Sequence, residues 1–114
     1  MAANPSTRIP ELTLRTEKNA HEATVYGSGK ITLATASLLQ QTIRGLIPEA
    51  KRILLDLTNV NYIDSSGIGT IVGIYLAASR VQCDLKVVNA QPRVSDLFEI
   101  TKLSAVLEEM RGSD

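Results

Sequence analysis

Two serines beside an aspartate and two glycines are the residues of this chain whose types and spacing could do chemistry. They lie in residues 61–69, Asn-Tyr-Ile-Asp-Ser-Ser-Gly-Ile-Gly, between an apolar run and a helix-compatible run. The hydroxyls of Ser65 and Ser66 therefore stand on a strand-to-helix turn. At such a turn an oxygen of Asp64 or of either serine could cap the helix, which is worth about 1 kcal/mol.

A phosphate on one of these serines is a second use of the same turn. It would lie near the unpaired N–H groups and the positive end of the helix dipole. It would change the surface charge by about −2 without melting the helix. A reversible interaction switch requires such a change. A cap and a switch can coexist, and the residues alone leave both open.

The sequence offers few residues for catalysis or for binding a metal. His21 is the single histidine and Cys83 the single cysteine, so we expect neither a Ser-His-Asp triad nor a metal cluster. His21 is expected to be an exposed turn residue. Residues 27–30, Gly-Ser-Gly-Lys, match a phosphate loop poorly because Ile31 stands where serine or threonine is needed. We predict no enzymatic activity, no metal and no cofactor, and nucleotide binding stays an alternative.

The length and the charge balance predict a single domain that does not bind a strongly charged partner. The 114 residues suffice for a single hydrophobic core. Twelve basic and twelve acidic residues leave no net charge, which argues against direct binding of nucleic-acid phosphates. No apolar stretch approaches the roughly 20 residues that insert into and span a membrane, and the N-terminus lacks the apolar core of a signal peptide. A lone cysteine indicates a cytosolic protein.

Hydrophobic periodicity predicts a hairpin followed by alternating helices and strands. The expected fold is an α/β sandwich, in which three to four helices pack on a mixed sheet of four to five strands in the order β-β-α-β-α-β-α. The domain is expected at 11–109, between a flexible segment at 1–10 and a frayed tail at 110–114. The near-continuously apolar strand 53–57 is expected at the centre, covered on both faces. The predicted strands are 11–17, 22–27, 53–57 and 84–89, the helices are 33–47, 69–80 and 92–100, and 103–108 is ambiguous.

The helix predicted at 69–80 is apolar almost all the way round. Such a helix is either wholly buried or leaves apolar surface for another molecule to cover. Complete burial is difficult in a chain of this size. The helix therefore indicates a partner surface or a weak homodimer.

The central residues 53–69 closely resemble the signature of STAS-domain anti-sigma-factor antagonists. In that family a strand ending in Asp-Leu is followed by Asp-Ser-Ser/Thr-Gly-Leu/Ile-Gly, as in this chain. The resemblance continues through 85–89, 92–94 and 97–103, and it covers roughly residues 11–108.

This resemblance implies a bacterial partner-switching module. The unphosphorylated form would bind an anti-sigma factor that is also a serine kinase, and would so free the sigma factor. The kinase would phosphorylate Ser65, ending the complex, and a serine phosphatase would restore it. The expected partner surface combines the exposed part of the following helix with a loop at 29–35. Its residues are Gly29, Lys30, Thr32, Asp64, Ser66, Gly67, Ile68 and Gly69, of which Asp64 and Ser66 shape the turn and the last two glycines allow close approach.

Departures from the family pattern qualify this expectation. Thr32 stands where the family has an aspartate, and Lys30 brings a positive charge where an acidic one is usual. Both predict an altered choice of kinase or efficiency of phosphorylation. Lys102 replaces the glycine of the family's Thr-Gly-Leu, so the closing helix is expected to be short or missing. The alternative role is a non-switching STAS subunit of a stress-signalling scaffold or of a lipid-transport ABC complex.

Overall fold

The computed structural model describes residues 10–101 as a four-stranded sheet packed against helices. The element order β-β-α-β-α-β-α and the mixed sheet confirm the predicted fold. None of the helices within 10–101 is long and apolar enough to cross a bilayer. The elements are β1 (Leu12–Lys18), β2 (Glu22–Ile31), α1 (Ala36–Leu46), β3 (Arg52–Ile63), α2 (Ser65–Arg80), β4 (Asp84–Val88) and α3 (Pro92–Thr101).

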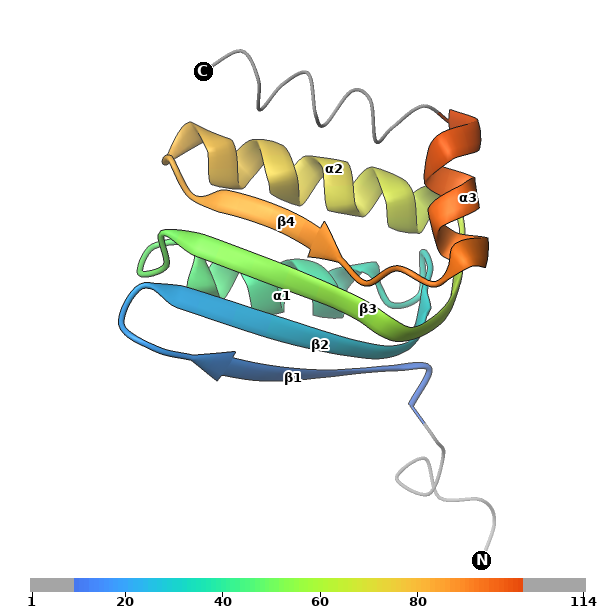
Figure 1. Cartoon of the computed structure of the whole chain (residues 1–114), viewed down its shortest axis with the longest axis horizontal. Helices are drawn as coiled ribbons and strands as arrows, with labels where there is room; N and C mark the ends of the chain where they lie inside the picture. Colours follow the sequence, from blue (N-terminus) through green and yellow to red (C-terminus); the bar gives the residue numbers. More distant parts are fainter. Residues whose placement is uncertain (1–9, 102–114) are drawn as a thin grey trace, which may run out of the picture.

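The sheet has the strand order β1-β2-β3-β4. β1 and β2 form the antiparallel hairpin, whereas β2, β3 and β4 run parallel. Figure 1 shows α1 behind the strands, α2 next to β4, and α3 at the end of the sheet where β3 finishes. Because the parallel strands all finish at this end, the turns that follow them meet there.

The core lies between the helices and one face of the sheet. Ile53, Leu55 and Leu57 of β3 alternate inward and are fully buried. Leu54 and Asp56 point to the other face and stay partly exposed, so the prediction that both faces of this strand are covered was wrong for the second face. Since α1 and α2 cover a single face, alternate residues of β3 remain in contact with water.

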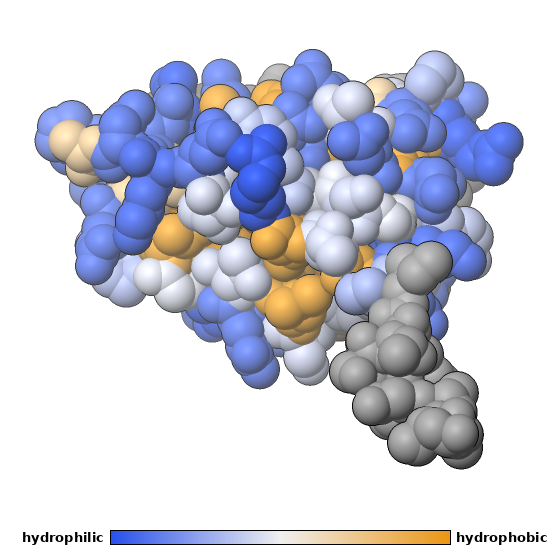
Figure 2. All heavy atoms as spheres, turned by 90° about the horizontal axis from the view of Figure 1, so that it is seen from below, coloured by the Kyte–Doolittle hydropathy of each residue, from blue (hydrophilic) through white to orange (hydrophobic). Residues whose placement is uncertain are grey.

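The sheet's β1 side offers no extended apolar band. Seen from this side in Figure 2, hydrophobic residues form a small group near the middle, enclosed by hydrophilic and intermediate ones. On β1 and β2 the polar residues also pair with one another, since the Arg15 guanidinium carbon lies 4.3 Å from the centre of the Tyr26 ring. Such a cation–π contact covers an aromatic face with a solvated charge.

β2 and β3 both continue further than the sequence predicts. β2 reaches Ile31 through a bulge at Gly29, which has φ +119° and would bring an added Cβ within 2.1 Å of the Glu11 carbonyl oxygen. Residues 29–31 therefore belong to a strand, so the predicted loop at 29–35 was wrong for its first half. Ile31 pairs with Ile63, which makes the two strands end side by side.

The helix boundaries also differ from the prediction. α1 begins at Ala36 instead of 33, because residues 32–35 form a turn closed by the Thr35 hydroxyl. This hydroxyl donates to the Lys30 carbonyl oxygen at 2.9 Å and accepts from the Thr32 N–H at 2.9 Å. α2 begins at Ser65 instead of 69, so the serines lie in its first turn. His21 is exposed, as expected. The predictions for 1–9, for 103–108, for Lys102 and for the tail lie outside the described residues.

Candidate functional site

Asp64 is the residue that caps α2. Its backbone is extended (φ −107°, ψ −178°), and its Oδ1 accepts a hydrogen bond from the Gly67 N–H at 2.8 Å. The Asp64 N–H donates to the Ile31 carbonyl oxygen at 3.2 Å, which joins the cap to the end of β2. The capping function that the sequence left open between Asp64 and the serines therefore belongs to the aspartate.

Ser65 occupies the first position of α2 and is exposed. No residue within 10–101 forms a hydrogen bond with its hydroxyl. Ser66 is half-buried, and its carbonyl oxygen accepts from the Thr70 hydroxyl at 2.8 Å. Of the two serines, Ser65 therefore presents the accessible hydroxyl.

The two glycines that follow the serines have different environments. An added Cβ on Gly67 would meet the Ile31 carbonyl oxygen at 2.3 Å and Ile63 Cγ1 at 2.8 Å, whereas one on Gly69 would meet nothing within 4 Å. Gly67 and the neighbouring Ile68 are buried, and Gly69 is exposed. Gly67 and Ile68 therefore pack α2 against the sheet. Of these three residues, Gly69 is the one exposed to solvent in the isolated chain.

The residues expected from β2 lie beside this turn. Ile31 of β2 pairs with Ile63 of β3. Thr32 comes directly after Ile31 and Asp64 directly after Ile63, so both residues lie at the same end of the sheet. The Lys30 ammonium lies 6.0 Å from the centre of the Tyr62 ring, its neighbour on β3. Gly29 lies further back in the bulge and is half-buried. Thus Lys30 and Thr32 border the serine turn, while Gly29 shapes the strand behind it.

A surface hollow of about 430 Å³, hereafter the Ser65 hollow, opens next to the turn. Its lining brings together the end of β3, the start of α2 and the start of α3. The sequence reasoning missed Arg93 in this setting, although the rule that parallel strands end at one edge could have placed the start of α3 near the serines. The lining residues are Tyr62, Ile63, Asp64, Ser65, Arg93 and Val94.

The segment that carries Arg93 is fastened to β3 by side-chain hydrogen bonds. Asp56 accepts from the Thr58 N–H and hydroxyl at 2.8 and 2.6 Å and from the Asn89 amide at 2.9 Å. Gln91 Nε2 donates to the Thr58 carbonyl oxygen at 2.7 Å. Burial alone would raise the pKa of Asp56, but these hydrogen bonds outweigh it and the pKa lies below its ordinary value. The ionised carboxylate thus helps to fix where α3 begins.

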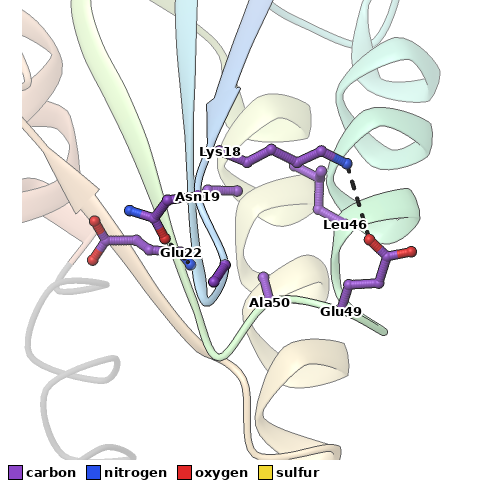
Figure 3. A pocket seen from close by; sticks show the side chains of 8 residues that line it. Lys18, Asn19, Glu22, Leu46, Glu49 and Ala50 are labelled. Atoms are coloured by element: carbon purple, nitrogen blue, oxygen red, sulfur yellow. Dashed lines mark hydrogen bonds and ion pairs between the residues drawn. The ribbon is translucent and has the colours of Figure 1, made fainter.

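A second hollow, of about 260 Å³, lies at the other end of the sheet. Figure 3 shows Lys18 reaching across it towards Glu49, an ion pair of 3.9 Å between exposed side chains. Exposed pairs of this kind contribute little to stability. Within 10–101 no group of three histidine, cysteine or acidic side chains could hold a metal ion. Of these two hollows, the Ser65 hollow is the one that contains an accessible hydroxyl.

Comparison with known proteins identifies the family from the sequence. The STAS domain model matches residues 13–112. An anti-sigma-B factor antagonist of Listeria monocytogenes is 30% identical over 105 residues, which cover 86% of this chain and 92% of the relative.

Solved structures share the fold at lower identity. An anti-sigma factor antagonist from Mycobacterium paratuberculosis has a TM-score of 0.74 at 22% identity, covering 91% of this chain and 86% of that one. The anti-sigma factor antagonist SpoIIAA in its unphosphorylated form has a TM-score of 0.70 at 17% identity, with 88% and 97% covered. The phosphorylated form of the Bacillus cell-fate determinant SpoIIAA has a TM-score of 0.66 at 17% identity, with 82% and 86% covered. The chain therefore belongs to the STAS domain family, and its named relatives are antagonists of anti-sigma factors.

Proposed function

We propose that this protein is a cytoplasmic anti-sigma-factor antagonist that is switched at Ser65. The unphosphorylated form binds an anti-sigma factor that is also a serine kinase, and phosphorylation of Ser65 releases it. A serine phosphatase returns the protein to the binding form. The observation that carries the proposal is the exposed Ser65 hydroxyl at the start of α2, left free because Asp64 performs the capping.

Ser65 is a substrate residue in this proposal. Its Oγ takes the γ-phosphoryl group of ATP, ADP leaves, and the hydroxyl proton passes to a base on the kinase. The new group adds about −2 of charge at pH 7. The positive end of α2 tolerates that charge, so the domain can stay folded while its surface changes. The named relatives of this chain are antagonists of anti-sigma factors, which supports a regulatory role in which Ser65 is modified by another protein.

The surface that continues from Ser65 along α2 suits a protein partner. Gly69 is exposed, and Val72, Gly73 and Leu76 follow at helical spacing and are half-buried. Leu33, in the turn before α1, is 76% exposed. Small and apolar side chains at the rim of a modifiable serine allow close docking, and a charge placed among them opposes it.

The most direct test is phosphorylation by a candidate kinase. Incubation with ATP and an anti-sigma factor kinase from the same genome should add one phosphate to the wild-type chain and none to Ser65→Ala. Ser66→Ala is the matched control, since it removes the neighbouring half-buried hydroxyl. Phosphate retained in Ser65→Ala would overturn the assignment of the site.

Lys30 and Thr32 are proposed to decide which kinase recognises the chain. Lys30→Glu and Thr32→Asp restore the charges that the family usually carries near the serine. With a kinase from a relative, these variants should be phosphorylated faster than the wild type. Equal rates would show that neither side chain contributes to kinase choice.

A permanent STAS subunit in a signalling scaffold or lipid-transport complex is the second candidate, favoured by the half-buried apolar stripe of α2. A permanent interface would bind Ser65→Asp and the wild type with equal affinity. The switch predicts that Ser65→Asp weakens binding by about 1 kcal/mol or more. Sedimentation of the free chain tests the predicted weak homodimer, and titration with ATP tests nucleotide binding.

A further inference from the structure

The Ser65 hollow joins two residues that are far apart in the sequence. Ser65 begins α2, and Arg93 is in the first turn of α3. Both line the same hollow of about 430 Å³ and both are exposed at its surface. Within the described residues no ion pair or hydrogen bond involves the Arg93 guanidinium. An arginine that has no partner among the described residues therefore shares a hollow with the Ser65 hydroxyl.

The backbone that carries Arg93 is held in place. The next residue, Val94, is 1% exposed and belongs to the core. On the other side, Gln91 donates to the Thr58 carbonyl oxygen at 2.7 Å. The Arg93 side chain is exposed and already lines the hollow, so it can reach an anion there without disturbing α3.

The other charges around the hollow leave room for an anion. The Asp64 carboxylate is the negative group nearest in sequence, and its Oδ1 already accepts from the Gly67 N–H at 2.8 Å. On β2, the Lys30 ammonium lies over the Tyr62 ring at 6.0 Å. Asp96, on the same helix as Arg93, is exposed, and no ion pair joins it to Arg93 within 10–101. Around the hollow, the cations Arg93 and Lys30 thus face the carboxylates of Asp64 and Asp96.

We propose that Arg93 is the internal partner of the phosphate on Ser65, holding it in the hollow between α2 and α3. A guanidinium binds two phosphate oxygens at once through parallel N–H donors. The contact stabilises the dianionic phosphoserine and fixes its position at the edge of the partner surface. In the phosphorylated form, the phosphate thus repels the partner by its charge and is also held in one position by Arg93. This inference rests on the proposed function in one respect, the identity of Ser65 as the modified residue.

The test measures the second pKa of the phosphate by ³¹P NMR on the full chain. Phosphoserine is installed at position 65 during synthesis, so that no kinase is needed. Arg93 favours the dianion and lowers this pKa below the ordinary value of about 6. In Arg93→Gln the pKa should rise by about 0.5 or more, the shift expected for unit charges about 5 Å apart in a water-like dielectric.

Two further variants separate the contact from general effects of charge or folding. Arg80→Gln removes the same charge from the last turn of α2, at the far end of that helix from Ser65, and should leave the pKa unchanged. Arg93→Lys keeps the charge without the planar fork and should restore most of the wild-type value. An Arg93→Gln pKa equal to that of Arg80→Gln would overturn the proposal. A failed kinase assay would contradict the switch but would not alter this titration, so the two failures can be told apart.

Discussion

Gly67→Ala should destabilise the protein even though alanine favours helices over glycine. An added Cβ at this position would lie 2.3 Å from the Ile31 carbonyl oxygen, well inside the 3.0 Å that real Cβ atoms keep. The obstacle is backbone, so a rotamer change cannot relieve it. The same oxygen accepts the Asp64 N–H at 3.2 Å, and a shift of α2 would weaken that bond too.

The expected loss follows from two costs and one opposing gain. Overpacking against a rigid neighbour costs about 1–3 kcal/mol, and weakening the shared hydrogen bond costs about 1 kcal/mol. Replacing glycine by alanine within a helix recovers at most about 1 kcal/mol. The net prediction is a decrease of about 2 kcal/mol in the free energy of unfolding.

Gly69→Ala is the matched control on the same helix. Nothing lies within 4 Å of its added Cβ, so the helix propensity acts alone and stability should rise by about 0.5–1 kcal/mol. Urea unfolding followed by circular dichroism measures both variants. With a typical slope of about 1–3 kcal/mol/M, Gly67→Ala should lower the midpoint by about 1 M. A Gly67→Ala midpoint at or above wild type would refute the close approach of α2 to β2.

Three other predictions concern the residues around the site. Asp64→Ala should cost about 1 kcal/mol in urea unfolding because it removes the cap, whereas Ser65→Ala should change stability by less than about 0.5 kcal/mol; equal losses would contradict the division of roles. The pKa of Asp56 is lowered in the folded state, so its stabilising contribution is complete above the ordinary aspartate value of about 3.9 and is lost as the pH falls through the folded value. Between pH 5 and 3 wild-type stability should therefore fall more steeply than that of Asp56→Asn, and parallel curves would count against the network. Burial, and then the charge of Asp84, raise the pKa of the Cys83 thiol, so a thiol reagent should label Cys83 slowly in native protein and rapidly in urea; fast native labelling would show that this part of the core opens.

The sequence predicted most of the fold because its signals were local. The run at 53–57 identified the central strand, and Pro92 correctly marked the first turn of α3. The strand ends were missed because they depend on pairing between chain segments. β2 and β3 continue as far as Ile31 and Ile63 because the two strands pair over this length, and the Asp64 N–H donates to the Ile31 carbonyl oxygen just beyond the pair. No single stretch of sequence reveals such pairing.

For the candidate site, the sequence indicated which residues to consider but not how they are arranged. The motif located Ser65, yet the sequence could not decide which oxygen caps the helix, because Asp64 and both serines are good capping residues. It also gave Gly67 and Gly69 the same role. Only the position of the Ile31 carbonyl oxygen separates a glycine required by packing from an open one. Arg93 was missed because its nearness to Ser65 depends on how α3 docks.

The central claim is that a phosphate on Ser65 controls partner binding, and one affinity comparison tests it most directly. Calorimetry can titrate an anti-sigma factor kinase with the unmodified chain and with the chain that carries phosphoserine at position 65. The switch predicts a dissociation constant about tenfold or more higher for the phosphorylated chain, which corresponds to a loss of about 1.4 kcal/mol of binding free energy. Tight binding of both forms with the same dissociation constant would contradict the account.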